Sequence, residues 1–491
     1  MASSLRQRVA SGVKATFAAN TFDMLANAAL IVLLTRYLLT PAEYGTLNFV
    51  LAAMSVVAIF ATLGLPKSAS RYVTEFSESD PGLVRHVVRR SLAFVIGLAL
   101  VVGVAIVTVG EPIARMIGQD TLVPFLLIGA GYVIGNALMQ YARELLRAFG
   151  RVEWSGIVRV AMSVGRVLFV VGLIVAGFGV AGALWGYVAG YLVAAVVGGL
   201  LLAKRLAGEF EATSDPDASI SRRILEYSVP LTATRGANVL DKKVDVLIVG
   251  ALLDVTAVGF YTIAKQISDF VSMPASSFGF TISPALGEQN SKGETARAAR
   301  MYERSLMYVL LAYVPAVTGL ALVADPMIRY VFGADYLGAV PVVQVYGGFI
   351  LVNAVNKVTS DGLDYLGRAR SRAIIKTAMA VANVILNLLL IPIFGVTGAA
   401  IATVITYTVY TSSNVYFIHQ ELSLTFTRVV RALGIVCLVT AGMAAAVWFA
   451  LPYVSGLVTL FGVVLVGVLV WGLLSVAGGV LDPREVARLL G

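Results

Sequence analysis

The sequence predicts an all-α polytopic membrane protein with about 14 transmembrane helices, and three observations support this fold class. The 491 residues are 58% hydrophobic and only 13% charged, whereas soluble proteins carry about 25% charged residues. Apolar stretches long enough to cross roughly 30 Å of hydrocarbon, about 20 residues each, recur from one end of the chain to the other. Lysines and arginines are concentrated in every second connection between these stretches, on one side of the predicted membrane.

Fourteen stretches qualify as spans. Their predicted ranges are 14–38, 43–65, 91–110, 122–142, 153–176, 179–203, 228–252, 257–284, 304–323, 339–361, 371–392, 397–418, 429–450 and 454–477. The first thirteen residues have positive charges but no small-residue cleavage site, so we interpret them as a cytoplasmic lead rather than a signal peptide.

The basic residues indicate the orientation of the spans. Of the 37 lysines and arginines, 26 fall in alternate segments that begin with the N-terminus, and only Arg115 and Arg329 fall in the complementary segments. Basic residues are retained on the cytoplasmic side of a membrane. We therefore expect both termini to be cytoplasmic.

The two halves of the chain resemble each other at an offset of about 214 residues. The matched positions are Gly45 with Gly259, Pro112 with Pro326, Gly150 with Gly367, Gly179 with Gly395 and Gly182 with Gly398. Repeats of six helices have the same orientation and are related by a pseudo-two-fold axis along the membrane normal. The predicted domains are a six-helix bundle at 1–203, a cytoplasmic linker at 204–225, a second bundle at 226–420, and two additional helices with a tail at 421–491.

The repeat places the charged stretch "VLDKKVDVLIVG" (239–250) in the middle of the seventh span, opposite Asn20, Asp23 and Asn27 of the first span. A charge at the bilayer centre costs at least about 2.5–3.5 kcal/mol, so such residues should face protein or water. Arginine suits phosphate because its planar fork forms two hydrogen bonds at once. The predicted contacts for an anionic substrate are Arg159, Arg166, Arg235, Lys242, Lys265 and Lys357, lining a water-filled cavity between the bundles. The predicted coupling or charge-balancing residues are Asp23, Asp241, Asp245 and Asp269.

A simpler interpretation is that these charges pair with one another and hold helices together. Lys265 and Asp269 are four residues apart, a spacing that brings helical side chains together, and Asp241 or Asp245 could neutralise Lys243. Asp23 has three possible roles: coupling to a proton or cation, packing between helices, or pairing with a base. The arginines outnumber the acids available at their depth, which favours an anionic ligand.

Other residue types argue against catalysis, cofactors and nucleic-acid binding. The chain has one cysteine, Cys437, and two distant histidines, so we expect no disulfide, no metal site and no cofactor. It has no phosphate-binding G-x-x-x-x-G-K-[ST] motif, and its basic residues are dispersed rather than gathered for nucleic acid. The predicted loops on the outer side are short, which argues against an enzyme that acts through them.

Two stretches resemble a known family. "GRARSRAIIKTAMAVANVILNLLLIPIFGVTGAAIATVITY" (367–407) and "RYLLTPAEYGTLNFV" (36–50) are similar to recurrent motifs of polysaccharide-export flippases. Their wider superfamily includes O-antigen flippases, the lipid II flippase and the multidrug and toxin extrusion transporters. The resemblance covers about residues 1–420, and fourteen spans favour the flippases over the drug extruders, which typically have twelve.

The resemblance implies a flippase in the cell membrane that moves a lipid-linked oligosaccharide, on a polyprenyl or dolichyl phosphate or diphosphate, to the outer leaflet by alternating access. The expected partners are this substrate, membrane lipids and a coupling ion (H⁺ or Na⁺), with the chain acting as a monomer. The alternative is a cation-coupled antiporter of drugs or small solutes, which predicts an acidic cavity. A membrane-embedded glycosyltransferase is a third class, for which the chain lacks both an acidic metal-binding motif and a large loop.

Overall fold

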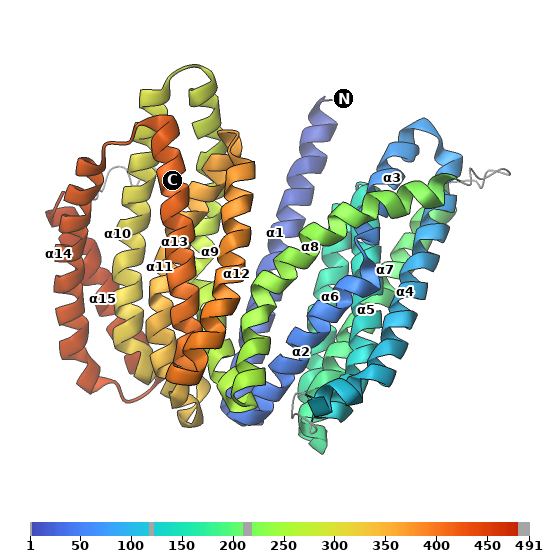
Figure 1. The fold of residues 1–491 in the computed structure, drawn as a ribbon, viewed down its shortest axis with the longest axis horizontal. Coiled ribbons are helices and arrows are strands. Elements are labelled where there is room, and N and C mark those ends of the chain that lie inside the picture. The colour runs from blue at the N-terminus through green and yellow to red at the C-terminus, as the bar shows by residue number, and fades with distance from the viewer. Residues whose placement is uncertain (1, 117–121, 210–218, 480–491) are drawn as a thin grey trace. The chain divides into compact units, whose positions relative to one another are not determined.

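The computed structural model describes residues 2–116, 122–209 and 219–479, and these residues form fifteen α-helices and no strand (Figure 1). The chain divides into two compact units, Met1–Ala251 and Leu252–Gly491. The long helices of the first unit are α1 (Ala2–Leu33), α2 (Pro41–Thr62), α4 (Pro81–Met116), α5 (Val123–Ala148), α6 (Val152–Leu173), α7 (Gly179–Glu209) and α8 (Ser219–Leu252). Those of the second are α9 (Val255–Ser291), α10 (Thr295–Met327), α11 (Val340–Tyr365), α12 (Ala369–Phe394), α13 (Val396–Leu422), α14 (Phe426–Ala450) and α15 (Leu457–Ala477).

These fourteen long helices correspond one to one to the fourteen predicted spans. Within the described residues, ten segments are long and apolar enough to cross a membrane, and one of them, Val152–Ala207, contains both α6 and α7. Helices α8, α9 and α13 are not among the ten. Their sequences explain this, because α8 contains many charged residues, α9 contains three charged residues and six serines, and α13 contains five threonines, two serines and one asparagine.

One helix was not predicted. Helix α3 (Leu65–Ser79) lies in the segment that we expected to be a cytoplasmic connection between the second and third spans. Its apolar residues recur every three or four positions and are buried, among them Leu65, Ala69, Tyr72 and Phe76. It packs on α4 and α5, so its apolar face is covered by the first unit itself.

Helix α3 also holds the start of α8. The Ser68 hydroxyl donates to the carbonyl of Ile224 at 2.8 Å, and the Tyr72 hydroxyl donates to that of Arg223 at 3.2 Å. The Arg223 guanidinium pairs with Glu75 at 3.2 Å. These contacts explain why the first unit extends to Ala251, although the repeat assigns α8 to the second bundle. The boundaries drawn from the repeat remain a prediction, and part of the linker (210–218) and of the tail (480–491) lies outside the described residues.

The backbone conformation supports the repeat. Gly150 and Gly367 both follow a long helix with positive φ, +68° and +79°. Gly179 and Gly395 share an unusual conformation, with φ/ψ of 50°/−134° and 59°/−144°, which a residue with a side chain rarely adopts. The packing repeats too, because α5 and α6 pack on α7 as α11 and α12 pack on α13.

Helix α9 contains Pro274, which has no N–H to donate and disturbs the helix ladder. The hydroxyl of Tyr313, from α10, lies at this point. It accepts from the Ala275 N–H at 3.0 Å and donates to the Val271 carbonyl at 3.0 Å. In an uninterrupted helix this donor and this acceptor would pair with each other. A side chain of α10 therefore satisfies the backbone of α9 beside the proline.

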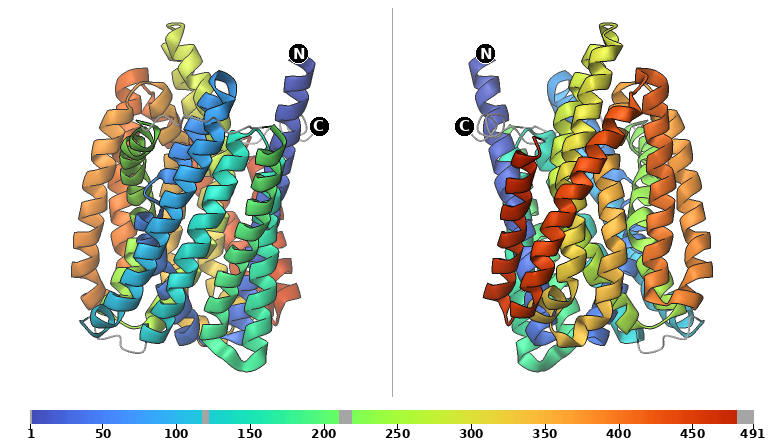
Figure 2. Two further views of the ribbon diagram at one scale, coloured as in Figure 1. Left: turned by 90° about the vertical axis from the view of Figure 1, so that its right-hand side faces the viewer. Right: turned by 90° about the vertical axis from the view of Figure 1, so that its left-hand side faces the viewer.

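Helices α14 and α15, which lie outside the repeat, pack together and on α10 (Figure 2). An apolar cluster joins them, formed by Val323, Met443, Val447, Leu460 and Val463. Buried Glu303 of α10 accepts from the Thr425 N–H at 2.6 Å and from Arg428 Nη1 at 3.2 Å, at the start of α14. Residues 296–307 are the beginning of α10 and provide this attachment.

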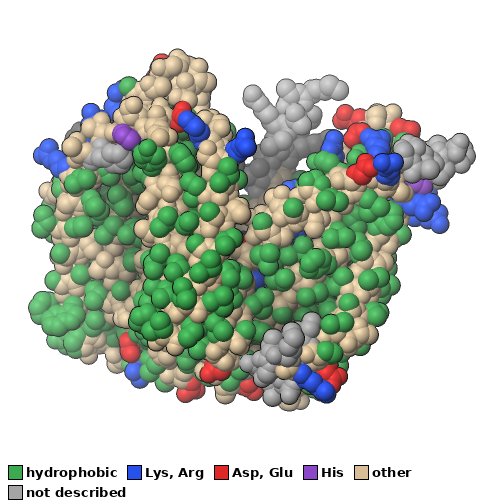
Figure 3. Space-filling model, in the orientation of Figure 1, with side chains coloured by type: hydrophobic (Ala, Val, Ile, Leu, Met, Phe, Trp, Pro, Cys, Tyr) green, Lys and Arg blue, Asp and Glu red, His purple; other side chains and the backbone are tan. Residues whose placement is uncertain are grey.

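The surface fits a membrane environment. On the face shown in Figure 3, hydrophobic side chains cover the middle of the helices, and charged side chains lie toward their ends. Apolar residues such as Phe461, Leu473 and Val458 are 70%, 71% and 85% exposed, which is expected where lipid rather than water surrounds a helix.

Candidate functional site

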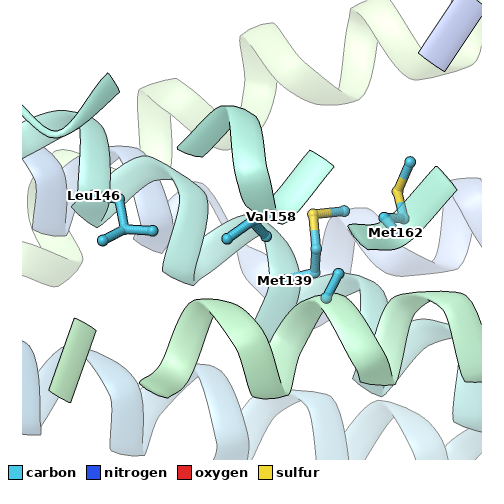
Figure 4. Packing of buried hydrophobic residues seen from close by; sticks show 5 residues of the cluster. Met139, Leu146, Val158 and Met162 are labelled. Atoms are coloured by element: carbon cyan, nitrogen blue, oxygen red, sulfur yellow. The ribbon is translucent and has the colours of Figure 1, made fainter. Parts of the chain in front are cut away.

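Two of the predicted basic residues, Arg159 and Arg166, lie on α6 where α1 packs on it. The two helices run in the same direction: Gly12 lies beside Val152, and Gly156 lies beside Ala15 and Ala19. Small residues at these positions allow close approach of the two backbones. On its other side, α6 packs against α5 and α7 through Met139, Leu146, Val158, Met162 and Ala194 (Figure 4). This apolar side fixes the rotation of α6, so that its polar side faces α1.

Asp23 of α1 is the centre of a polar cluster with α6. Its Oδ1 lies 3.5 Å from Arg166 Nη2, and its Oδ2 lies 3.9 Å from Arg159 Nη1. The Ser163 hydroxyl donates to the same carboxylate, and Arg159 donates to the side-chain oxygen of Asn20. Arg159 and Arg166 are seven residues apart, the spacing at which helical side chains share a face. Asp23 is therefore paired with two bases in this structure, and its role in coupling remains a prediction.

Arg166 is the most enclosed of the charged residues in this cluster. It is only 9% exposed, and its guanidinium lies 5.5 Å from the centre of the Tyr187 ring of α7. A Cβ added to Gly190 of α7 would lie 2.8 Å from the Arg166 nitrogen and 2.9 Å from its Cα, so a glycine is required there. The Nε and Nη2 atoms of Arg166 are buried and have no hydrogen-bond partner. Its 3.5 Å approach to Asp23 is therefore an ion pair without a hydrogen bond, and it leaves donor capacity unused.

Arg159 also borders a small pocket that is open to the surface. The lining comes from α1 (Thr16, Ala19, Asn20), α5 (Arg143, Arg147) and the first turns of α6 (Val152, Ser155, Gly156, Arg159). Arg147 pairs with Glu144 at 3.1 Å. Arg143 interacts electrostatically with Arg159, Arg147, Glu144 and Asp23. Three arginines thus line one pocket, and they share two acids.

The basic residues of α8 lie in differing surroundings. Arg235 is half-buried and interacts electrostatically with Glu144 and Tyr132 of α5, which connects it to the α1–α5–α6 cluster. Lys242 is exposed, whereas Asp245 is 4% exposed, so these two residues do not share the surroundings that their spacing suggested. Asp241, Lys243 and Asp245 all have interaction partners, and their role in balancing charge remains a prediction.

The second unit contains the remaining predicted residues. Lys265 of α9 lies 5.9 Å from the centre of the Tyr261 ring. Within the described part of the chain no ion pair joins it to Asp269, which is exposed. Lys357 of α11 is half-buried. Its backbone packs closely on α9, because a Cβ added to Gly279 would overlap the Lys357 carbonyl oxygen. The six predicted basic residues are therefore divided, four in the first unit and two in the second.

Sequence reasoning missed Arg143, Arg147 and Ser163. The two arginines were assigned to a cytoplasmic loop because the fourth span was predicted to end at 142, whereas α5 continues to Ala148. The spacing of Met139, Arg143 and Arg147, four residues each, was the available signal for a longer helix. Ser163 lies between Arg159 and Arg166 on the same face and has no charge to attract notice.

Comparison with known proteins identifies the relatives of this chain. Residues 9–289 match the family described as "Polysaccharide biosynthesis protein". Over 436 residues, 88% of each chain, the sequence is 24% identical to the "Probable low-salt glycan biosynthesis flippase Agl15" of Haloferax volcanii.

Solved structures share the fold. The lipid II flippase MurJ in an inward closed conformation superposes with a TM-score of 0.72 at 14% identity, over 94% of this chain and 97% of that one. An inward-facing multidrug resistance transporter of the MATE family gives a TM-score of 0.65 at 17% identity, over 82% and 94% of the two chains. These similarities confirm the all-α membrane fold with two repeated bundles. With more than half of its length matched to the family, the chain belongs to the polysaccharide biosynthesis proteins.

Proposed function

We propose that this protein is a flippase that moves a lipid-linked oligosaccharide from the cytoplasmic to the outer leaflet, for the assembly of surface polysaccharide or protein-linked glycan. The observation that carries the proposal is the excess of arginine in the helices of a polysaccharide biosynthesis protein. Within the described part of the chain, the acids that interact with Arg143, Arg147, Arg159, Arg166 and Arg235 are Asp23 and Glu144. An anionic phosphate or diphosphate would satisfy the remaining donors.

The relatives support this substrate class. The Haloferax relative is named as a glycan biosynthesis flippase, and the solved structure with a TM-score of 0.72 is named as a lipid II flippase. The proposed head-group contacts are Arg159, Arg166, Arg235, Lys242, Lys265 and Lys357. The lipid tail would stay in the bilayer, so the chain needs to enclose only the charged head and its sugars.

Transport by alternating access follows from a fold built of two repeated helical bundles. The chain would need no catalytic residue, because flipping breaks no covalent bond. The 26-to-2 distribution of basic residues supports a plasma-membrane protein with both termini in the cytoplasm. We propose that a single chain transports its substrate and that a proton or sodium ion drives it.

A drug antiporter is the second candidate, since a multidrug transporter shares the fold. The charges described above argue against it. A carrier of cationic drugs needs acidic side chains to attract them, whereas Asp23 and Glu144, the acids beside the arginine cluster, are already paired with arginines.

The proposal is tested with the double variant Arg235→Ala, Lys242→Ala in cells that depend on this protein for surface glycan. We expect glycan display to be lost while the variant remains in the membrane at its normal level. The matched control is the double variant Arg89→Ala, Arg90→Ala, since both arginines are exposed at the start of α4. Normal glycan display by the Arg235/Lys242 variant would refute the head-group contacts, and survival of display after gene deletion would refute the flippase itself.

A further inference from the structure

We infer that the pocket between α1, α5 and α6 binds a phosphoryl group through Arg143, Arg147 and Arg159, and that Arg159 is shared between this ligand and Asp23. The inference rests on the proposed function for the ligand, the phosphorylated head of a polyprenyl carrier. It adds a site that includes two arginines outside the predicted set and gives Asp23 a role in controlling it.

The lining of the pocket matches an oxyanion. Three arginines line it, together with the neutral polar residues Thr16, Asn20 and Ser155. The side-chain oxygen of Asn20 already accepts from Arg159, which leaves its NH₂ group to donate. Planar guanidinium groups bind phosphate oxygens in pairs. The pocket contains no carboxylate among its lining residues, so nothing within it repels an anion.

The start of α6 adds to this preference. Val152, Ser155 and Gly156, all from its first turns, line the pocket. The residue that precedes the helix, Arg151, provides no side-chain hydrogen bond to the helix start. A helix N-terminus carries partial positive charge and unpaired N–H groups, and it therefore favours an anion.

Unused donors show that the arginines are not satisfied by their present partners. The Nε of Arg143 is buried without a hydrogen-bond partner, as are Nε and Nη2 of Arg166. Arg143 Nη1 approaches only the sulfur of Met139, at 4.0 Å. A buried donor without a partner costs free energy, so Arg143 keeps hydrogen-bonding capacity that its present neighbours do not use.

Arg159 connects the pocket to the buried ion pair. It borders the pocket and also lies 3.9 Å from Asp23 Oδ2, a longer separation than that of a close charge-assisted hydrogen bond. Asp23 lies closer to Arg166, at 3.5 Å, and accepts from Ser163. A bound anion can therefore draw Arg159 from Asp23 while Arg166 and Ser163 keep the carboxylate paired. The arrangement makes Asp23 a competitor for Arg159, which limits anion binding in the empty state.

The test is calorimetric titration of the purified full chain in detergent micelles. The ligands are farnesyl diphosphate, inorganic pyrophosphate and farnesol. We expect farnesyl diphosphate to bind and farnesol not to bind. Arg143→Gln and Arg147→Gln should each weaken binding roughly tenfold, as expected for loss of one hydrogen bond between charged groups, whereas the exposed-arginine control Arg89→Gln should leave it unchanged.

Asp23→Asn should strengthen binding severalfold, because it releases Arg159; a merely structural aspartate would weaken it or have no effect. Pyrophosphate binding as tight as that of farnesyl diphosphate would support the pocket and assign it to free phosphate. Unchanged farnesyl diphosphate binding in both Arg143→Gln and Arg147→Gln would overturn the inference. Arg147 is exposed, so its variant gives an answer even if Arg143→Gln does not fold.

A flipping assay in proteoliposomes separates this inference from the proposed function. Flipping of a lipid-linked oligosaccharide together with arginine-independent binding would overturn the pocket and leave the flippase intact. Arginine-dependent binding by a protein that flips no lipid-linked oligosaccharide would support the pocket and reject the function.

Discussion

Helices α6 and α12 occupy the same place in the two repeats, yet they hold different chemistry. The offset between Gly150 and Gly367 is 217 residues, which places Arg166 of α6 over Asn383 of α12. The offset between Gly179 and Gly395 is 216 residues, which places Gly190 of α7 over Thr406 of α13. In the first unit Arg166 packs on Gly190. In the second, Asn383 Nδ2 donates to the Thr406 hydroxyl at 3.3 Å.

The difference shows that equivalent pairs of packed helices can hold either a charged arginine or a network of neutral hydrogen bonds. The absence of a side chain at Gly190 brings α7 against the Arg166 backbone, and the guanidinium extends away to Tyr187 and Asp23. At the equivalent place the Thr406 side chain provides an acceptor, and Asn383 in turn accepts from the amide of Asn387 at 2.9 Å. The two repeats share the backbone arrangement of these helices, but the residues at the contact between the helices differ. The arginine cluster is therefore a feature of the first unit.

The largest expected effect comes from transplanting the second unit's residue into the first. Gly190→Thr places a Cβ within 3 Å of the Arg166 backbone, and overpacking of this kind costs about 3 kcal/mol. Unfolding of the purified protein in detergent micelles measures the loss. The control is Gly199→Thr on the same helix, where an added Cβ meets nothing within 4 Å. Equal stability of the two variants would show that the α6–α7 contact is not as close as described.

The next effect concerns the charge itself. Arg166→Asn copies the residue of α12 and leaves Asp23 with Arg159 alone. We expect a loss of about 2 kcal/mol, less than for a pair enclosed on both sides, because the Asp23 side chain is 26% exposed. Adding Asp23→Asn should recover part of this loss, since it removes the incompletely paired carboxylate. A double variant as unstable as the sum of the two single variants would mean that the two residues do not interact.

A smaller effect is expected in the neutral network. Asn383→Ala removes the hydrogen bond to Thr406 and leaves the buried Asn387 amide without this acceptor, which should cost about 1.5 kcal/mol. Thr377→Ala is the control, because its exposed hydroxyl bonds only to the Ala373 carbonyl within its own helix. If both variants unfold alike, the network contributes no stability to the second unit.

The smallest expected effect concerns a feature that the two repeats share, a side chain that caps the start of a helix. Thr40 caps α2 through Glu43, and Asp254 caps α9 through a 2.7 Å bond from the Ala257 N–H. Thr40→Ala and Asp254→Ala should each cost about 1 kcal/mol, measured by the same unfolding experiment. A difference larger than the expected cost itself would contradict equivalent roles for the two caps.

Much of the fold could be predicted from the sequence, because span length and apolarity are local properties. All fourteen long helices correspond to predicted spans, and the glycines matched between halves, such as Gly179 and Gly395, share a backbone conformation. Helix α3 was missed because it is too short and too polar to be a span, and its burial depends on α4 and α5.

The candidate site was predicted less well, because charge and spacing identify residues but not their partners. Spacing placed Arg159 and Arg166 on one face, yet it did not show that both reach Asp23. Lys242 and Asp245 share a face by spacing and differ in burial, which spacing alone does not predict. Arg143 and Arg147 were not predicted as site residues because the predicted span ended at residue 142, six residues before the end of α5.

The tyrosine that bridges the backbone beside Pro274 also makes the helix ladder of α9 depend on another helix. The Ala275 amide proton is bonded to the Tyr313 hydroxyl of α10, so its exchange with deuterium requires the two helices to separate. A helix that bends at an unassisted proline would instead exchange there by local opening. The protection of this one amide therefore reports whether α9 and α10 move as a single body, and it can be followed while the remainder of the chain stays folded.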